Sequence, residues 1–179
     1  MSDGQSSILG GSGRFREKRR SSIAPASGRG EPALEAIKTI VAGAPLPTVL
    51  DFLCRAMEEE SRDGLIACIH PVDEAATMFR DGAAPSLPRA YGEATNGMRI
   101  ASMAGPCCHA VATQRPVMVR DLAADPKWSA VHGLAAELGL RACWSTPIFS
   151  AEGKVLGTFA HYYREPRDPS PPTRIWWRC

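Results

Sequence analysis

Two apolar runs joined by a short turn constrain the fold of this chain more than any other feature of its sequence. Residues 141–149 and 154–163 are rich in aromatic and β-branched side chains, and the turn residues Ala151, Glu152 and Gly153 lie between them. Runs of this length and spacing are typical of neighbouring antiparallel strands. We therefore predict a β-hairpin here.

Upstream of this hairpin, helical and strand patterns follow one another. Apolar residues recur at helical spacing after Pro32 and again after Pro47, which predicts two helices. Asp125 begins an amphipathic segment, and Gly139 suits the C-terminal end of its helix. Four shorter elements are also expected: a strand over 65–70, a strand over 76–80, a helix over 107–113 and a strand over 117–120.

The length of 179 residues allows one domain of ordinary size. Residues 1–31 are rich in Ser and Gly and carry a basic cluster, a composition that buries too little apolar surface to become ordered. We therefore expect a disordered basic tail over 1–31, a domain over 32–168 and an irregular tail over 169–179.

Charge and cysteine content exclude several classes of protein. The 21 basic and 19 acidic residues give a formal net charge of +2, so we expect no nucleic-acid binding. The sequence shows neither an export signal nor an apolar run long enough to cross a membrane. We expect a cytoplasmic protein whose six cysteines are reduced.

The second half of the chain carries four motifs in succession: GPC from Gly105, then VRDLAADPKW, LGLRACWSTPI and GKVLGTFAHYYREPR. In order and spacing they resemble the signature half of GAF domains from bacterial sensor proteins. Upstream, the stretch LPTVLDFLCRAMEEESRDGLIACIHPVD is similar to the first helix and first strand of that family. The resemblance implies an α/β (α+β) fold, in which helices cover both faces of an antiparallel sheet of five or six strands.

The resemblance also implies a role in bacterial signal transduction, including two-component systems. GAF domains of bacterial sensors are small-molecule-binding or regulatory modules that lie beside output domains. For this chain the family implies an unidentified small ligand. It implies as partner either a second copy of the chain, in a homodimer, or a histidine kinase or cyclase output domain. The terminal helix that the family places after Pro171 is replaced by PTRIWWRC, so we expect a truncated end and no output domain within this chain.

Several cysteines, histidines and tryptophans are candidates for lining a ligand pocket. They are Cys68, His70, Cys107, Cys108, His109, Trp128 and Trp144. Tryptophan faces supply contact area at small entropic cost. Cys54, Cys68 and Cys143 lie on apolar stripes or strands, where a cysteine behaves as a small hydrophobe.

The dipeptide Cys108–His109 matches the pair through which bilin-carrying GAF domains attach and contact a tetrapyrrole. The flanking sequence of such photoreceptors is absent, so we expect no bilin and, through either His109 or His70, no haem. Adjacent cysteines also lack the spacing of structural zinc ligands, so we expect no metal.

Two thiol-based alternatives stay open. Cys107 or Cys108 is a redox-sensing thiol if the N-terminus of the expected helix lowers its pKa. Free methionine sulfoxide reductases share the GAF fold and use cysteines, but no cysteine lies between Val119 and Arg141, where that enzyme type needs one. No phosphate-binding loop or nucleophile elbow is present, so we expect a module that is not an enzyme.

Overall fold

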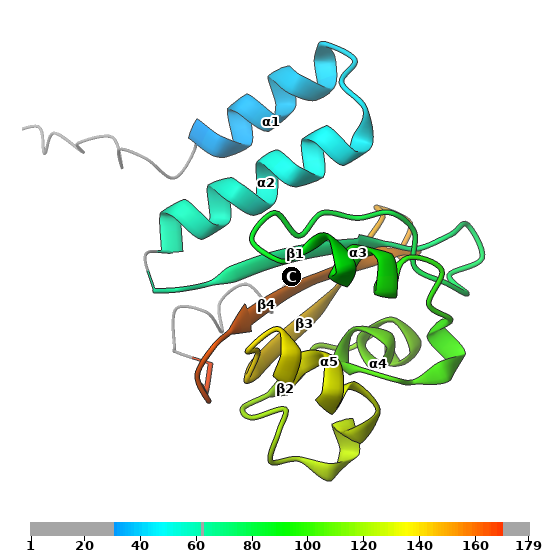
Figure 1. Cartoon of the computed structure of the whole chain (residues 1–179). Coiled ribbons are helices and arrows are strands. Elements are labelled where there is room, and N and C mark those ends of the chain that lie inside the picture. Colours follow the sequence, from blue (N-terminus) through cyan, green and yellow to red (C-terminus); the bar gives the residue numbers. More distant parts are fainter. Residues whose placement is uncertain (1–30, 62, 170–179) are drawn as a thin grey trace, which may run out of the picture.

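A four-stranded antiparallel sheet lies at the centre of the structure, a computed structural model that describes residues 31–61 and 63–169 (Figure 1). Its spatial order is β1-β4-β3-β2. The strands are β1 (Ile66–Pro71), β2 (Val117–Val119), β3 (Ala142–Phe149) and β4 (Val155–Tyr163). The hairpin predicted from the sequence is confirmed, because β3 pairs with β4 in antiparallel register.

The register of the strands sorts their side chains onto two faces. Cys143 lies opposite Tyr162 in the β3–β4 pair, and Ile66 of β1 also lies opposite Tyr162. Because successive side chains of a strand point to opposite faces, Trp144 and Tyr163 lie on the other side of the sheet. The rings of Trp144 and Tyr163 pack there with their centroids 4.8 Å apart. The side chains of Tyr162 and Tyr163 therefore face opposite ways.

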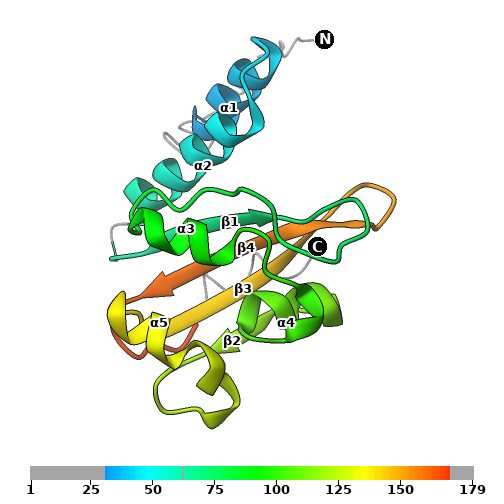
Figure 2. The same cartoon turned by 45° about the vertical axis from the view of Figure 1, so that its right-hand side comes forward.

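A helical hairpin covers one face of the sheet. It consists of α1 (Glu31–Val41) and α2 (Leu46–Ser61), the two helices predicted from the apolar spacing. Leu50 and Cys54 of α2 form a buried cluster with Ala67 and Ile69 of β1. Figures 1 and 2 show α1 packed on the outer side of α2, away from the sheet.

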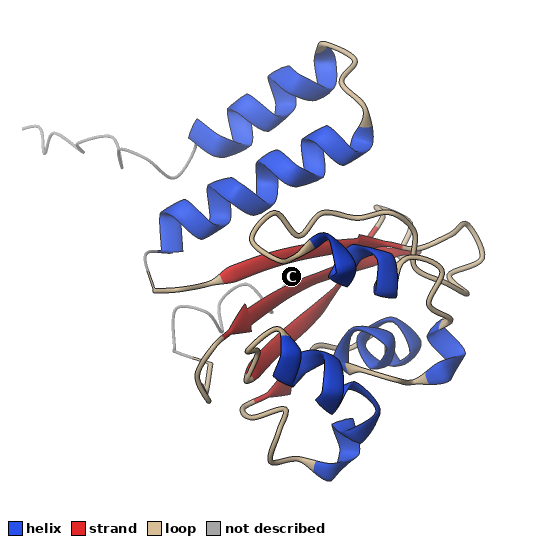
Figure 3. Cartoon of the chain, viewed as in Figure 1, coloured by secondary structure: helices blue, strands red, loops and turns tan. Residues whose placement is uncertain are grey.

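Three short helices cover the opposite face, where the largest buried cluster lies. They are α3 (Arg89–Thr95), α4 (Pro106–Thr113) and α5 (His132–Glu137), and Figure 3 separates them from the strands by colour. Two 3₁₀ turns, η1 (Ile100–Ser102) and η2 (Pro126–Val131), connect them. Helices therefore lie on both faces of an antiparallel sheet, and the α+β fold expected from the resemblance is confirmed.

The helix expected from Asp125 is divided in two. The Asp125 side chain accepts a hydrogen bond from the Lys127 backbone N–H at 3.0 Å, which caps η2 as its residue type predicts. The backbone leaves helical geometry at Trp128, with φ −102° and ψ 18°, and α5 begins four residues later. Gly139 follows α5 with φ 64°, a left-handed conformation that favours glycine.

The strand expected over 76–80 is a looped segment instead. Ala76 has φ 52°, which interrupts an extended chain, and the Asp73 carboxylate accepts hydrogen bonds from the Thr77 and Met78 backbone N–H groups. Only isolated bridges remain, one of which joins Val72 to Phe79. The described sheet therefore has four strands, where five or six were expected.

No described helix combines the length with the apolar character needed to span a membrane. Apart from residues 31 and 169, the tails expected over 1–31 and 169–179 lie outside the described residues, and so does the expected truncation after Pro171. Those assignments stay predictions.

Candidate ligand-binding site

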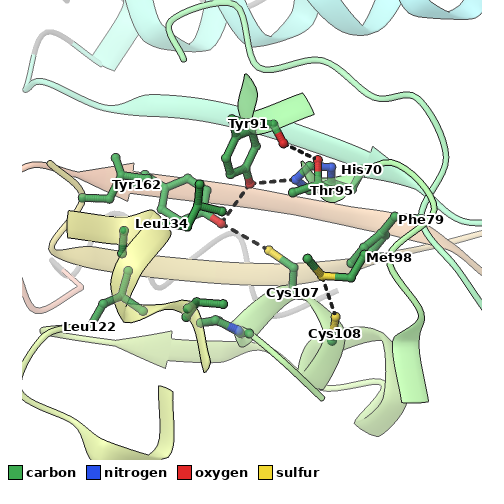
Figure 4. A pocket seen from close by; sticks show the side chains of 15 residues that line it. His70, Phe79, Tyr91, Thr95, Met98, Cys107, Cys108, Leu122, Leu134 and Tyr162 are labelled. Atoms are coloured by element: carbon green, nitrogen blue, oxygen red, sulfur yellow. Dashed lines mark hydrogen bonds between the residues drawn. The ribbon is translucent and has the colours of Figure 1, made fainter. Parts of the chain in front are cut away.

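A cavity of about 60 Å³ lies between the sheet and the helices α3, α4 and α5 (Figure 4). Most of its wall is apolar. The apolar and sulfur-containing side chains that contribute are Phe79, Met98, Cys108, Leu122, Val131, Leu134, Ala135 and Leu140. A mostly apolar hollow with a few polar groups is the usual form of a small-molecule site.

The polar part of the wall comes from four different elements. β1 supplies His70, β4 supplies Tyr162, α3 supplies Tyr91 and the first turn of α4 supplies Cys107. Gly157 of β4 allows β1 to approach closely, because a Cβ at this position would collide with the backbone carbonyl of His70. The close pairing of β1 and β4 thus fixes His70 and Tyr162 on one face.

These polar groups, together with Cys68, form a continuous hydrogen-bonded chain that we call the polar strip. Cys107 Sγ lies 3.6 Å from Tyr162 Oη, which lies 3.1 Å from Tyr91 Oη. Tyr91 Oη is 2.8 Å from His70 Nε2, and that nitrogen is 2.9 Å from Cys68 Sγ. Figure 4 shows Tyr91, Tyr162 and Cys107 pointing toward one another.

The cavity wall carries no acidic side chain, no lysine and no arginine among the described residues that line it. Burial lowers the pKa of His70 to about 4, because the charged imidazolium loses its hydration, so His70 is neutral at neutral pH. Burial likewise raises the pKa values of Tyr91 and Tyr162 well above their ordinary value. The side chains of His70, Tyr91 and Tyr162 are therefore uncharged at neutral pH.

Cys107 is the one described cysteine whose pKa is lowered. A hydrogen bond from Cys143 is the main cause, and the hydroxyl groups of Ser145, Tyr162 and Thr158 add to it against the effect of burial. Ser145 Oγ and Thr158 Oγ1 are buried and have no hydrogen-bond partner within residues 31–61 and 63–169. The thiolate form of Cys107 is therefore surrounded by neutral donors.

The chain matches the GAF domain family over residues 43–176, which is most of its length. It belongs to the GAF family. The methyl sulfide methyltransferase-associated sensor of Methanosarcina acetivorans is 36% identical to this GAF domain over 133 residues. The match covers 74% of the present chain and 13% of that sensor, so the chain spans only a small part of its relative.

Solved structures share the fold of this GAF domain. A putative GAF sensor protein from Burkholderia vietnamiensis superposes with a TM-score of 0.57 at 18% identity, covering 81% of this chain and 83% of that chain. Free methionine-R-sulfoxide reductase from Neisseria meningitidis, in complex with its substrate, gives 0.55 at 19% identity, covering 84% of this chain and 85% of that chain. At these identities the likeness shows the fold alone.

Four of the seven residues proposed from the sequence meet at this site. His70, Cys107 and Cys108 line the cavity of the GAF domain, and Cys68 belongs to the polar strip through its contact with His70. Burial raises the pKa of Cys108, although this residue neighbours Cys107 in the same helical turn. Cys108 Sγ points to Met98 Sδ, 3.7 Å away.

The other three candidates lie elsewhere. His109 and Trp128 pack edge to face with ring centroids 4.9 Å apart, and neither lines the cavity. Trp144 is buried on the opposite face of the sheet, beside Tyr163. The dipeptide that resembles a bilin attachment pair thus points its cysteine and its histidine to different surroundings.

Sequence reasoning missed the two tyrosines that join the polar strip. Tyr91 lies on α3, a helix that was not expected, and only the apolar residue Leu87 before it hinted at a buried turn. Tyr162 was placed on β4, but the alternation of strand residues does not tell which face carries the site.

In the described part of the chain, no group of three or more His, Cys, Asp or Glu side chains is arranged to hold a metal ion.

Proposed function

We propose that this GAF domain is the input module of a signalling protein and binds a small, uncharged molecule in its cavity without catalysing a reaction. The observation that carries the proposal is the apolar wall of the cavity with one neutral polar strip. A ligand there alters the packing of α3, α4 and α5 against the sheet. Such a change shifts the population of states that a linked output domain senses.

The size of the cavity limits the ligand. A volume of about 60 Å³ for water-sized spheres corresponds to roughly four water molecules, since one such molecule needs about 10–15 Å³ on this measure. The hydroxyl groups of Tyr91 and Tyr162 are donors for a single acceptor atom on the ligand. A ligand with about four heavy atoms binds with a Kd on the order of millimolar, because little apolar surface is buried.

A methionine sulfoxide reductase activity is the second candidate, because such a reductase shares the fold. Free methionine sulfoxide is a zwitterion, and an ammonium or carboxylate group buried without a partner is costly. The described cavity wall offers no acidic or basic side chain to the amino-acid head group. This lining favours a sensor of neutral molecules.

We further propose that the domain carries no bilin or haem. A tetrapyrrole is far larger than the cavity, and His109 packs on Trp128 outside it. Absence of visible absorbance after expression with a bilin or haem supply is the expected result. A stable Soret or bilin band on the purified chain would contradict it.

We propose a cytoplasmic location and a second copy of the chain as partner, with a histidine kinase or cyclase output domain as the alternative partner. Two observations support these assignments: the described cysteines are all free of disulfides, and an apolar stripe on α1 is exposed. Leu34, Ile37 and Val41 of this stripe are 53%, 56% and 81% exposed.

Dimethyl sulfoxide and free methionine sulfoxide form a matched pair of probes for the proposed site. Both carry a sulfoxide oxygen, but only the second carries a charged head group. We expect chemical-shift changes in a ¹⁵N-labelled chain with dimethyl sulfoxide at the cavity residues, and none there with methionine sulfoxide. Stronger binding of methionine sulfoxide at the cavity, with its reduction in the presence of a thiol reductant, would favour the reductase.

Two variants of α5 control this experiment. Ala135 is buried and lines the cavity, whereas its neighbour Ala136 is exposed. Ala135→Leu fills the cavity and should abolish the shifts, and Ala136→Leu should keep them. Equal binding by the two variants would contradict the proposed site.

A further inference from the structure

Three of the four thiols in the largest buried cluster come from three different elements. Cys68 lies on β1, Cys143 lies on β3 and Cys107 lies in the first turn of α4, which packs on β3. Cys143 is paired across the strands with Tyr162, and the Tyr162 hydroxyl reaches Cys107. The sequence suggested only a small hydrophobe at Cys143, so its place in one cluster with Cys107 is a property of the fold.

Cys143 is the thiol placed to react with Cys107. Its side chain lies in the same buried cluster as that of Cys107, and its strand packs under α4. Cys68 is held differently, because its Sγ contacts His70 Nε2 at 2.9 Å and Tyr91 Oη at 3.6 Å. The pair Cys107–Cys143 therefore joins a helix to the sheet beside the cavity.

The surroundings of Cys107 suit attack on a small neutral oxidant. Cys107 lines the cavity and is 7% exposed, whereas Cys143 is 0% exposed. Ser145 and Thr158 present buried hydroxyl groups with no hydrogen-bond partner in the described chain, and these are available to stabilise a thiolate at Cys107. Hydrogen peroxide is uncharged and has two heavy atoms, so a cavity of about 60 Å³ admits it.

We propose that Cys107 and Cys143 are a peroxide-responsive pair, in which Cys107 is oxidised first and Cys143 then closes an intramolecular disulfide. The Cys107 thiolate attacks one oxygen of hydrogen peroxide, the O–O bond breaks and hydroxide leaves, which yields a sulfenic acid on Cys107. The Cys143 sulfur then attacks that sulfur and its proton leaves with the hydroxyl group as water. The two thiols have lost two electrons, and the peroxide has been reduced.

This disulfide would act on the ligand site, because Cys107 is part of the cavity wall and of the polar strip. Its formation removes the Cys107 hydrogen-bond partner of Tyr162. The inference does not depend on which ligand the cavity takes. Its test measures the oxidation of the thiols in the absence of any ligand.

The test uses the full reduced chain, treated with hydrogen peroxide and digested under non-reducing conditions for mass spectrometry. We expect one cross-linked pair of peptides, Cys107 with Cys143, that a thiol reductant reverses. Linkage of Cys107 to Cys68, a disulfide between two chains, or six unchanged thiols in the folded protein would each overturn the proposal. The urea-unfolded chain serves as a reference, in which this selectivity should disappear.

Three variants separate the roles of the thiols. Cys107→Ala should slow the reaction of the chain with peroxide at least about tenfold, because the thiolate is the attacking species. Cys143→Ala should leave a sulfenic acid on Cys107 that dimedone traps. Cys54→Ala is the matched control, because Cys54 is buried on the other face of the sheet, and burial raises its pKa to about 12. A Cys54→Ala chain that loses the cross-link while keeping its native near-ultraviolet circular dichroism would contradict the assignment.

Discussion

At the scale of single residues, the polar strip explains how an apolar cavity holds polar groups without charge. Each of Cys68, His70, Tyr91, Tyr162 and Cys107 has a partner within the strip, so none requires water. Buried polar groups are tolerated when they are hydrogen-bonded, and a linked set also fixes the side-chain orientations. The strip therefore presents a defined donor and acceptor pattern to a ligand.

The Tyr162 hydroxyl is the central link of this strip, and its removal is a direct test. Tyr162→Phe leaves Cys107 and Tyr91 each without one partner, so we expect the free energy of unfolding to fall by about 1 kcal/mol. The same change should raise the pKa of Cys107, because the Tyr162 hydroxyl stabilises its thiolate. Urea unfolding and thiolate absorbance at different pH values measure the two effects. Tyr163→Phe, on the opposite face, should leave the pKa of Cys107 as it is.

Buried histidine gives the domain a predictable dependence on pH. The pKa of His70 is lowered from 6.5 to about 4, and burial also lowers that of His161 to about 4. At pH values between about 4 and about 6.5, these histidines bind protons in the unfolded chain but not in the folded chain. The free energy of unfolding therefore falls as the pH is lowered from about 6.5 to about 4. The expected loss is up to about 3 kcal/mol per histidine.

His70→Gln should remove about half of this pH dependence, since His161 still titrates. Urea unfolding at several pH values between about 4 and about 7 measures the slope. A slope that is the same in the variant and the original chain would show that His70 is not the group responsible.

At the scale of elements, the sequence was informative where a pattern is local. The helices α1 and α2 and the β3–β4 hairpin follow from periodicity and turn residues, which depend only on neighbours along the chain. The segment between β1 and α4 did not follow, because its shape depends on side-chain contacts. Asp73 holds a turn that interrupts the expected strand, and Phe79 is buried under the site.

The same difference applies to the candidate site. Residue type alone pointed to His70 and Cys107, because buried histidine and cysteine in a motif are chemically distinctive. Tyr91 could not be assigned, since its role depends on α3 being folded over β1. Cys143 was assigned as a small hydrophobe because its neighbour in space, Cys107, is far away in sequence.

The exposed stripe of α1 provides a prediction about association. Ile37→Glu should weaken a homodimer, because it places a charge in the middle of an apolar contact, and should change monomer stability little since Ile37 is 56% exposed. Analytical ultracentrifugation over a range of concentrations measures the effect. Lys38→Glu, which changes a neighbouring exposed residue, is the control. A chain that is monomeric before the substitution would contradict the proposed dimer.

At the scale of the whole molecule, the sheet divides two roles between its faces. The α1–α2 hairpin covers one face and exposes an apolar stripe, while the cavity lies under α3, α4 and α5 on the other (Figure 2). The strands β1 and β4 contribute residues to both sides.

The central claim is that a small neutral molecule occupies the cavity, and intermolecular nuclear Overhauser effects locate such a molecule directly. With dimethyl sulfoxide as the probe, we expect cross-peaks from its methyl protons to the methyl groups of Met98 and Leu134, which line the cavity. We expect none to Leu50, which is buried on the other face of the sheet. Cross-peaks confined to surface residues, or their absence from Met98 and Leu134 at saturating probe, would contradict the account.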